Sequence, residues 1–194
     1  MNKQLIRTAY HEAGHAVASH LVGSGTKRVT IKPKAGSLGH HETWSFLTAD
    51  ERLALESSDR YEFGATKALR KVTNKSMILL AGGYAEKTHT GRYNRLGASA
   101  DIDSYHDLIV RLFPDETEMK LFDRWIRRRT EMLMKNSWWR VEAIARALCE
   151  RTTLKGDEIR DVLGKAVEKR IRLSSLDSTA TRVRRKLNIE TSRK

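Results

Sequence analysis

Apolar residues recur every three or four positions over most of the chain, a spacing typical of amphipathic helices. The first apolar stripe runs from Leu5 to Val22 and stops at Gly23-Ser24-Gly25, a sequence that ends helices well. Gly82-Gly83 within a later helical pattern indicates close helix packing or a kink. In chain order, the further predicted helices cover residues 50–57, 65–86, 99–113, 116–135, 137–150 and 158–172.

Alternation of apolar and polar residues is confined to a short segment after the first helix. Arg28–Lys32 alternates and is rich in β-branched residues, which predicts a strand, and Pro33 at its far end is typical of an edge strand or of the exit from a strand. A second strand is expected over 41–46. We therefore predict a mainly α fold, a helical bundle with a small β ribbon beside the first helix. The free edge of this ribbon would suit an extended peptide.

One domain is expected over residues 1–173, because a chain of 194 residues can bury one good core. Residues 174–194 are polar and basic with little periodicity, which predicts a loosely ordered tail.

The single cysteine, Cys149, excludes a disulfide framework and favours a reducing compartment. Since no apolar run is long enough for a membrane span, we expect a cytoplasmic protein without membrane contact.

The formal charge of +13 raises nucleic acid, anionic membranes and acidic proteins as partners. The basic residues are spread along the chain, with local clusters at Arg127–Arg129 and Arg182–Lys186. No helix-turn-helix or zinc-finger signature accompanies them. A solvated basic surface is therefore favoured over a dedicated nucleic-acid site.

The first predicted helix carries His11-Glu12-Ala13-Gly14-His15, which has the HExxH pattern. Two histidines four residues apart lie one helical turn apart, so both imidazoles can reach one metal ion. The glutamate of this pattern acts as general base in zinc hydrolases. Gly14 lacks a Cβ atom, which would let another backbone segment approach the metal. The alternative, a surface helix with two unrelated histidines, is disfavoured by the helical context.

A third ligand is needed, and Asp101 falls on the inward side of the 99–113 helix, whereas Asp103 faces outward. A buried carboxylate must be paired or bound to a metal. However, Asp101 would also compensate the dipole at the helix N-terminus, and the spacing alone leaves both interpretations open. Of His40 and His41, at most one can face a metal from a strand, and neither is counted as a ligand.

The segment Ala9–Ala16 resembles the active-site helix of the FtsH family, the membrane-anchored AAA+ zinc proteases. This resemblance implies that Asp101 is the third zinc ligand, in preference to Asp103, Asp107 or Glu86. Ala100 departs from the family, which usually has an asparagine there. The similarity continues, in order, through Val29–Pro33, Leu38-Gly39, Leu80–Glu86, Gly97–Ile102 and Leu154–Ile159.

No G-x-x-x-x-G-K-[ST] phosphate loop occurs, and the chain begins just upstream of the zinc helix. We therefore expect neither an ATPase module nor a membrane segment. The sequence predicts a free-standing, FtsH-like zinc metalloendopeptidase that cleaves flexible or unfolded polypeptides independently of ATP. His11, His15 and Asp101 would bind Zn²⁺, and Glu12 would be the general base.

Two alternatives from other classes are a peptidase-derived adaptor that binds without cutting and a basic nucleic-acid-binding protein. Retention of the base Glu12 argues against the adaptor, because metal binding alone does not need it. The resemblance also implies a homo-oligomer, with a hexamer as the family's form. A separate ATPase is a further partner to be considered.

Overall fold

The computed structural model describes residues 2–33, 39–42, 48 and 63–191, and the side chains within them except those of 42, 63–66 and 176–191. The predicted helix over 50–57 and most of the second predicted strand lie outside the described residues. The described elements are α1 (Lys3–Leu21), β1 (Arg28–Thr30), β2 (His40–Glu42), α3 (Phe63–Thr90), α4 (Ser99–Leu112), α5 (Glu116–Asn136), α6 (Trp138–Arg151), β3 (Thr153–Lys155) and α7 (Gly156–Thr191).

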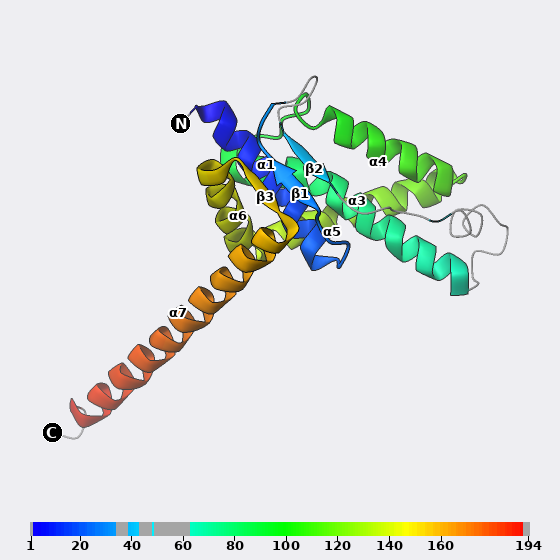
Figure 1. Ribbon diagram of the computed structural model, residues 1–194. Coiled ribbons are helices and arrows are strands. Elements are labelled where there is room, and N and C mark those ends of the chain that lie inside the picture. The colour runs from blue at the N-terminus through cyan, green and yellow to red at the C-terminus, as the bar shows by residue number, and fades with distance from the viewer. Residues whose placement is uncertain (1, 34–38, 43–47, 49–62, 192–194) are drawn as a thin grey trace.

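The mainly α fold with a small sheet beside the first helix is confirmed (Figure 1). Helix α1 lies at the centre and packs mainly against α3 and α6. The apolar stripe predicted on α1 forms the heart of this core, with fully buried Ala9, Ala13 and Val17. A second cluster, centred on Tyr105 and Ile126, joins α3 to α4 and α5. The helical periodicity of the sequence therefore corresponds to real burial.

The sheet has three antiparallel strands in the order β2-β1-β3. Val29 pairs with His41 on one side and with Leu154 on the other. Of the two alternatives for Pro33, the edge strand is therefore wrong, because a segment more than 120 residues later occupies the second edge of β1, whereas the strand exit agrees with the end of β1 at Thr30. Three-residue β3 is too short to show alternation, so the sequence pattern predicted no strand there. Among the described residues, β2 is the edge on the side of the first helix's metal motif.

Helices α1 and α3 pack with their backbones close together. A Cβ atom on Gly14 would lie 2.6 Å from the carbonyl oxygen of Ala81 and 2.7 Å from the Cβ of Ala85. A Cβ on Gly82 would collide with the imidazole of His15. Helix α3 runs without a break through Gly82-Gly83, so the glycine pair serves close packing and not a kink.

Helix α7 is longer than predicted and continues past residue 172 to Thr191. Its last turns extend away from the body of the molecule in Figure 1. No proline or glycine follows Gly164 in this segment, so nothing in the backbone chemistry ends the helix. The boundary of the domain at residue 173 stays a prediction. None of the described helices has an apolar run long enough to cross a membrane.

Candidate metal centre

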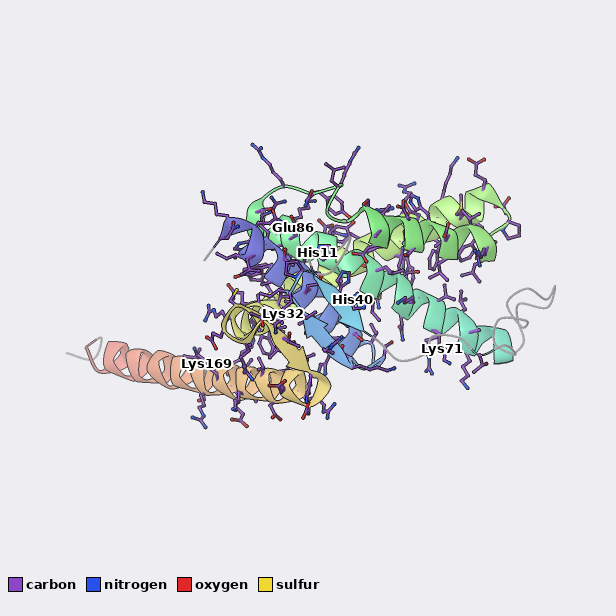
Figure 2. All side chains as sticks on the ribbon, turned by 45° about the horizontal axis from the view of Figure 1, so that its top comes forward. His11, Lys32, His40, Lys71, Glu86 and Lys169 are labelled. Carbon is purple, nitrogen blue, oxygen red and sulfur yellow. The ribbon has the colours of Figure 1, made fainter. Side chains whose placement is uncertain are left out.

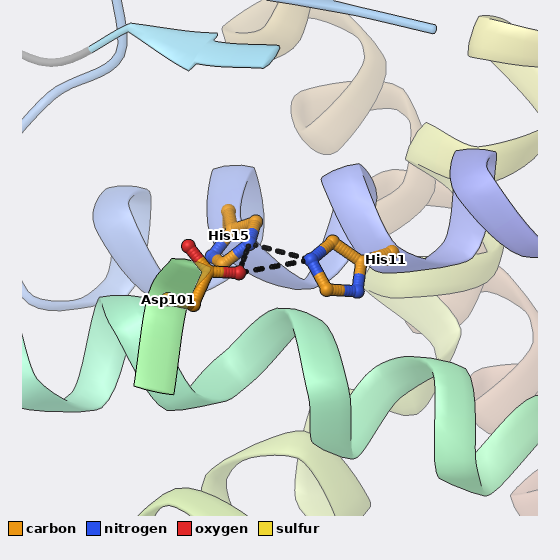
Figure 3. A group of neighbouring side chains, drawn as sticks. All are labelled: His11, His15 and Asp101. Carbon is orange, nitrogen blue, oxygen red and sulfur yellow. Dashed lines mark hydrogen bonds and ion pairs between the residues drawn. The ribbon is translucent and has the colours of Figure 1, made fainter. Parts of the chain in front are cut away.

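Three side chains that are distant in sequence meet between α1, α3 and α4. The Nε2 atoms of His11 and His15 lie 3.0 Å apart, and Oδ2 of Asp101 lies 3.0 Å from the first and 3.1 Å from the second (Figure 3). Both histidines are buried. Two imidazole nitrogens and a carboxylate oxygen thus form a nearly equilateral triangle.

The dimensions of this triangle fit a tetrahedral metal. Ligand atoms about 2.0–2.1 Å from zinc in a tetrahedral site are separated from one another by about 3.3 Å. The three observed separations of 3.0–3.1 Å are close to that value. Within the described part of the chain, His11, His15 and Asp101 form a group of three metal-binding side chains whose ligand atoms lie close enough together to hold one ion. Three protein ligands would leave a fourth position open, as in catalytic zinc sites.

The outward nitrogens of both imidazoles are held by oxygen acceptors. Nδ1 of His15 lies 2.7 Å from the carbonyl oxygen of Ile78, to which it donates a hydrogen bond. Nδ1 of His11 lies 3.4 Å from a carboxylate oxygen of Glu86. A neutral imidazole that keeps its proton on Nδ1 presents a lone pair on Nε2. Such partners are the usual means of orienting metal-binding histidines, so this arrangement also fits a metal.

Glu86 is itself fixed by neighbours from two other segments. Its Oε1 accepts hydrogen bonds from Nε and Nη2 of Arg7, at 3.0 and 2.6 Å, and from Nδ2 of Asn94 at 3.0 Å. The carboxyl is buried, and these hydrogen bonds, together with the one to His11, outweigh desolvation and keep its pKa below the usual range. Glu86 therefore contacts His11 as an anion, on the side away from Asp101.

The electrostatics of the three side chains are strongly coupled in the metal-free protein. Burial opposes protonation of His11, yet its hydrogen bonds with Asp101 and Glu86 raise its pKa to about 10. Burial alone would raise the pKa of Asp101, but the charges and hydrogen bonds of the two histidines hold it well below its usual range. A positive charge is therefore favoured at the centre of the triangle, where a divalent cation would supply it.

Glu12 lies beside the triangle, and its carboxylate is buried. Its Oε2 atom has no hydrogen-bond partner among the described residues. A Cβ atom on Gly39 would collide with the other oxygen, so the glycine leaves room for this carboxylate. Burial raises the pKa of Glu12, and the charges of His15 and His11 partly offset this effect. A buried carboxylate oxygen without a hydrogen-bond partner destabilises the fold unless a bound group donates a hydrogen bond to it.

A cleft with a volume of about 540 Å³ opens over the triangle. Helix α3 contributes Lys75 and Ile78 to its lining, and β2 contributes His40 and His41. The ring of His41 stacks on that of His15, with centroids 5.7 Å apart, and its Nε2 lies 3.0 Å from the hydroxyl of Thr26. Both strand histidines line the cleft, and the ring of His41 contacts a residue of the triangle, but neither belongs to the ligand group found among the described residues.

The structure separates the four acidic side chains that were considered as third ligand. Only Asp101 reaches both histidines, whereas Asp103 and Asp107 are exposed on the outer side of α4. Glu86 contacts the rear of His11. The sequence pattern missed the roles of Glu86, Arg7 and Lys75. Arg7 could have been found, because it precedes His11 by one helical turn on α1.

No protein-family model matches the chain. A curated protein of Rhodopirellula baltica, ATP-dependent zinc metalloprotease FtsH 1, is 25% identical over an alignment 206 positions long that covers 85% of this chain and 28% of that protein. The chain resembles the FtsH zinc metalloproteases. Proteins named ATP-dependent zinc metalloprotease FtsH from Cupriavidus metallidurans and Thermus thermophilus are each 27% identical, over 80% of this chain.

The resemblance predicted from the residues is thus confirmed, and it extends over most of the chain. The chain spans only 28% of the length of each of these FtsH proteins.

Proposed function

We propose that the chain is a zinc metallopeptidase that hydrolyses peptide bonds in flexible or unfolded polypeptides. The observation that carries this proposal is the triangle of His11, His15 and Asp101 next to the buried, unpaired Oε2 of Glu12. The FtsH resemblance supports zinc as the metal. A site that only stored a metal would have no use for a buried carboxylate without a partner.

In this proposal His11, His15 and Asp101 hold the zinc ion. When bound, zinc supplies a Lewis acid and lowers the pKa of a coordinated water to about 7. Glu12 accepts a proton from the attacking water at Oε2 and passes it to the leaving amine. Ile78 and Glu86 keep the two imidazoles in the orientation that the ligands need.

The substrate is an extended polypeptide segment. The cleft over the triangle has a volume of about 540 Å³, and His40 and His41 of β2 belong to its lining. An extended segment laid along β2 would gain main-chain hydrogen bonds, a common way of binding peptides at a sheet edge. The correction of the sheet order moves this proposed docking edge from Val29 to the strand of His40 and His41.

The decisive experiment incubates the purified chain with casein, with zinc and then with a chelator. We expect slow cleavage with zinc, none with chelator, and recovery when zinc is restored. The Glu12→Gln variant, prepared in parallel, detects a contaminating protease. A zinc-loaded chain that cuts no unfolded polypeptide would overturn the proposal and favour the non-cutting adaptor.

We also infer self-association of the chain. Helices α4 and α5 expose large apolar side chains, with Val110 and Leu121 each 60% and Trp125 48% exposed. Clusters of exposed apolar side chains mark contact surfaces. Light scattering across the micromolar range should give a mass above that of a monomer, and a monomer mass throughout would refute this inference.

A further inference from the structure

One face of α3 contributes residues from Lys75 to Glu86 to the lining of the cleft. Lys75 and Leu79 line one end, Gly82 lies under the two imidazoles, and Glu86 lies at the other end. Gly82 is seven residues beyond Lys75, which places it about 10 Å further along the helix axis. The cleft thus has a direction, with a lysine at one end and an acidic group at the other.

The charges of the cleft are paired except at the lysine end. Arg7 balances Glu86 through two hydrogen bonds. A zinc ion would balance the charges of Asp101 and Glu12. Lys75 is the one lysine or arginine among the described residues that line the cleft, and no hydrogen bond or ion pair joins it to a described residue. A zinc-loaded cleft therefore keeps one positive charge, at Lys75.

The position of Lys75 favours an anionic ligand over a purely structural role. The side chain is half-buried, and desolvation lowers its pKa, an effect that Asp101 opposes. Lysines without a role in binding keep the ammonium in water, whereas an ammonium that is partly withdrawn from water gains from a carboxylate.

We propose that Lys75 binds a carboxylate of the peptide substrate, from either an acidic side chain or the chain terminus, and thereby determines which bonds are placed over the metal. This inference rests on the proposed peptidase function. An extended peptide advances about 3.3 Å per residue. The separation of about 10 Å between Lys75 and Gly82 along α3 therefore places the carboxylate about three residues from the scissile bond.

The test measures binding and cleavage separately. Heptapeptides of alanine and leucine carry one glutamate at each position in turn, with matched glutamine peptides, and each is made with a free or an amidated C-terminus. Fluorescence anisotropy with the zinc-loaded Glu12→Gln variant gives affinities without turnover. The wild-type chain gives cleavage rates. At one position, we expect the glutamate peptide to bind about tenfold more tightly than the matching glutamine peptide, the usual gain from a hydrogen bond to a charged group. If the terminal carboxylate is the ligand, the free peptide should instead bind about tenfold more tightly than the amidated one.

Four variants identify the group responsible. Lys75→Gln should abolish the preference for the carboxylate, and Lys75→Arg should keep it. Lys71→Gln is the matched control, because it removes the same charge from α3 one turn away, outside the cleft lining (Figure 2). Lys75→Glu should reverse the preference. Zinc content is measured for every variant.

The outcomes separate this inference from the proposed function. A carboxylate preference in binding that depends on Lys75, in a chain that does not cut, would refute the peptidase and leave the binding role standing. Equal affinities for glutamate and glutamine peptides, and for free and amidated C-termini, would overturn the inference even if cleavage is seen. Loss of zinc from Lys75→Gln, with equal weakening of every peptide, would also overturn it, because Lys75 would then support Asp101.

Discussion

Glu86 approaches His11 from the side opposite Asp101, with its Oε2 atom 3.4 Å from Nδ1 of the imidazole. The imidazole of His11 thus lies between two carboxylates: Asp101, which would bind the same metal ion, and Glu86, which would not. Arg7 and Asn94 fix the outer carboxylate in turn. The orientation of a ligand on α1 therefore depends on a residue near the end of α3.

This relationship gives the first prediction. Glu86→Gln should weaken zinc binding by about 10-fold to 100-fold, the usual effect of removing the partner of a metal-binding histidine. Competition with a chromogenic chelator measures the dissociation constant. Glu150→Gln, which neutralises an exposed glutamate on α6, is the control and should leave zinc affinity unchanged. Equal affinity of the two variants would show that the Glu86 contact does not orient His11.

The second prediction concerns the third ligand. The wild-type chain should carry about one zinc ion, as a three-ligand catalytic site does. Asp101→Ala should lose most of it, because two imidazoles alone hold zinc poorly. Asp103→Ala, two residues away on the exposed side of α4, should keep it. Elemental analysis after dialysis measures both, and the same zinc content in the two variants would reject the assignment of Asp101.

The third prediction separates binding from chemistry. Glu12→Gln keeps the size and helix preference of the side chain but removes its basicity. Cleavage of casein should fall by about 10²-fold to 10⁴-fold, the usual contribution of a general base. Zinc content should stay at the wild-type level. Undiminished cleavage would mean that another group is the base.

The fourth prediction tests the contact between α1 and α3. Gly14→Ala adds a methyl group that would lie 2.6 Å from a backbone oxygen of Ala81. Overpacking of this kind costs about 1–3 kcal/mol and should exceed the gain in helix propensity of about 1 kcal/mol. Gly164→Ala on α7 is the control, because nothing lies within 4 Å of its added Cβ. Urea titration should show the first variant destabilised and the second stabilised.

The fifth prediction concerns folded substrates. The chain contains no phosphate-binding loop, so ATP should not change its cleavage rate. A stable globular domain should remain intact, and destabilising mutations in that domain should make it cleavable in proportion to its open population. Gel analysis of time courses with and without ATP measures this. Digestion of the stable domain only when ATP is present would contradict the prediction.

The sequence predicted the helices well and the contacts between them poorly. Apolar periodicity located α1 and α4–α6 because each buries one continuous stripe. The same periodicity left Asp101 open between two interpretations, and the FtsH resemblance was needed to choose. The helical spacing did separate Asp101 from Asp103, which it placed on the outward side of α4, where the structure has it exposed.

Glu86 and Lys75 escaped sequence reasoning for a different reason. Both lie on α3, where each could equally have been a solvated surface charge. Their roles depend on the small residues of α1 and α3, which bring the two backbones together and turn that face of α3 toward the metal centre. The third strand was missed because its three residues acquire their conformation only from pairing with β1.

The pairing of Val29 with Leu154 also sets the order in which a newly made chain can complete its fold. His11 and His15 leave the ribosome before Asp101, which follows about 90 residues later, and β3 follows another 50 residues behind it. Contacts of such long sequence separation form late and slowly. During synthesis the second edge of β1 stays without its partner until Leu154 has emerged. A nascent chain that has emerged as far as Asp101 therefore holds all three proposed ligands while one edge of β1 still lacks its partner, and such an unpaired edge is a site of unwanted strand pairing.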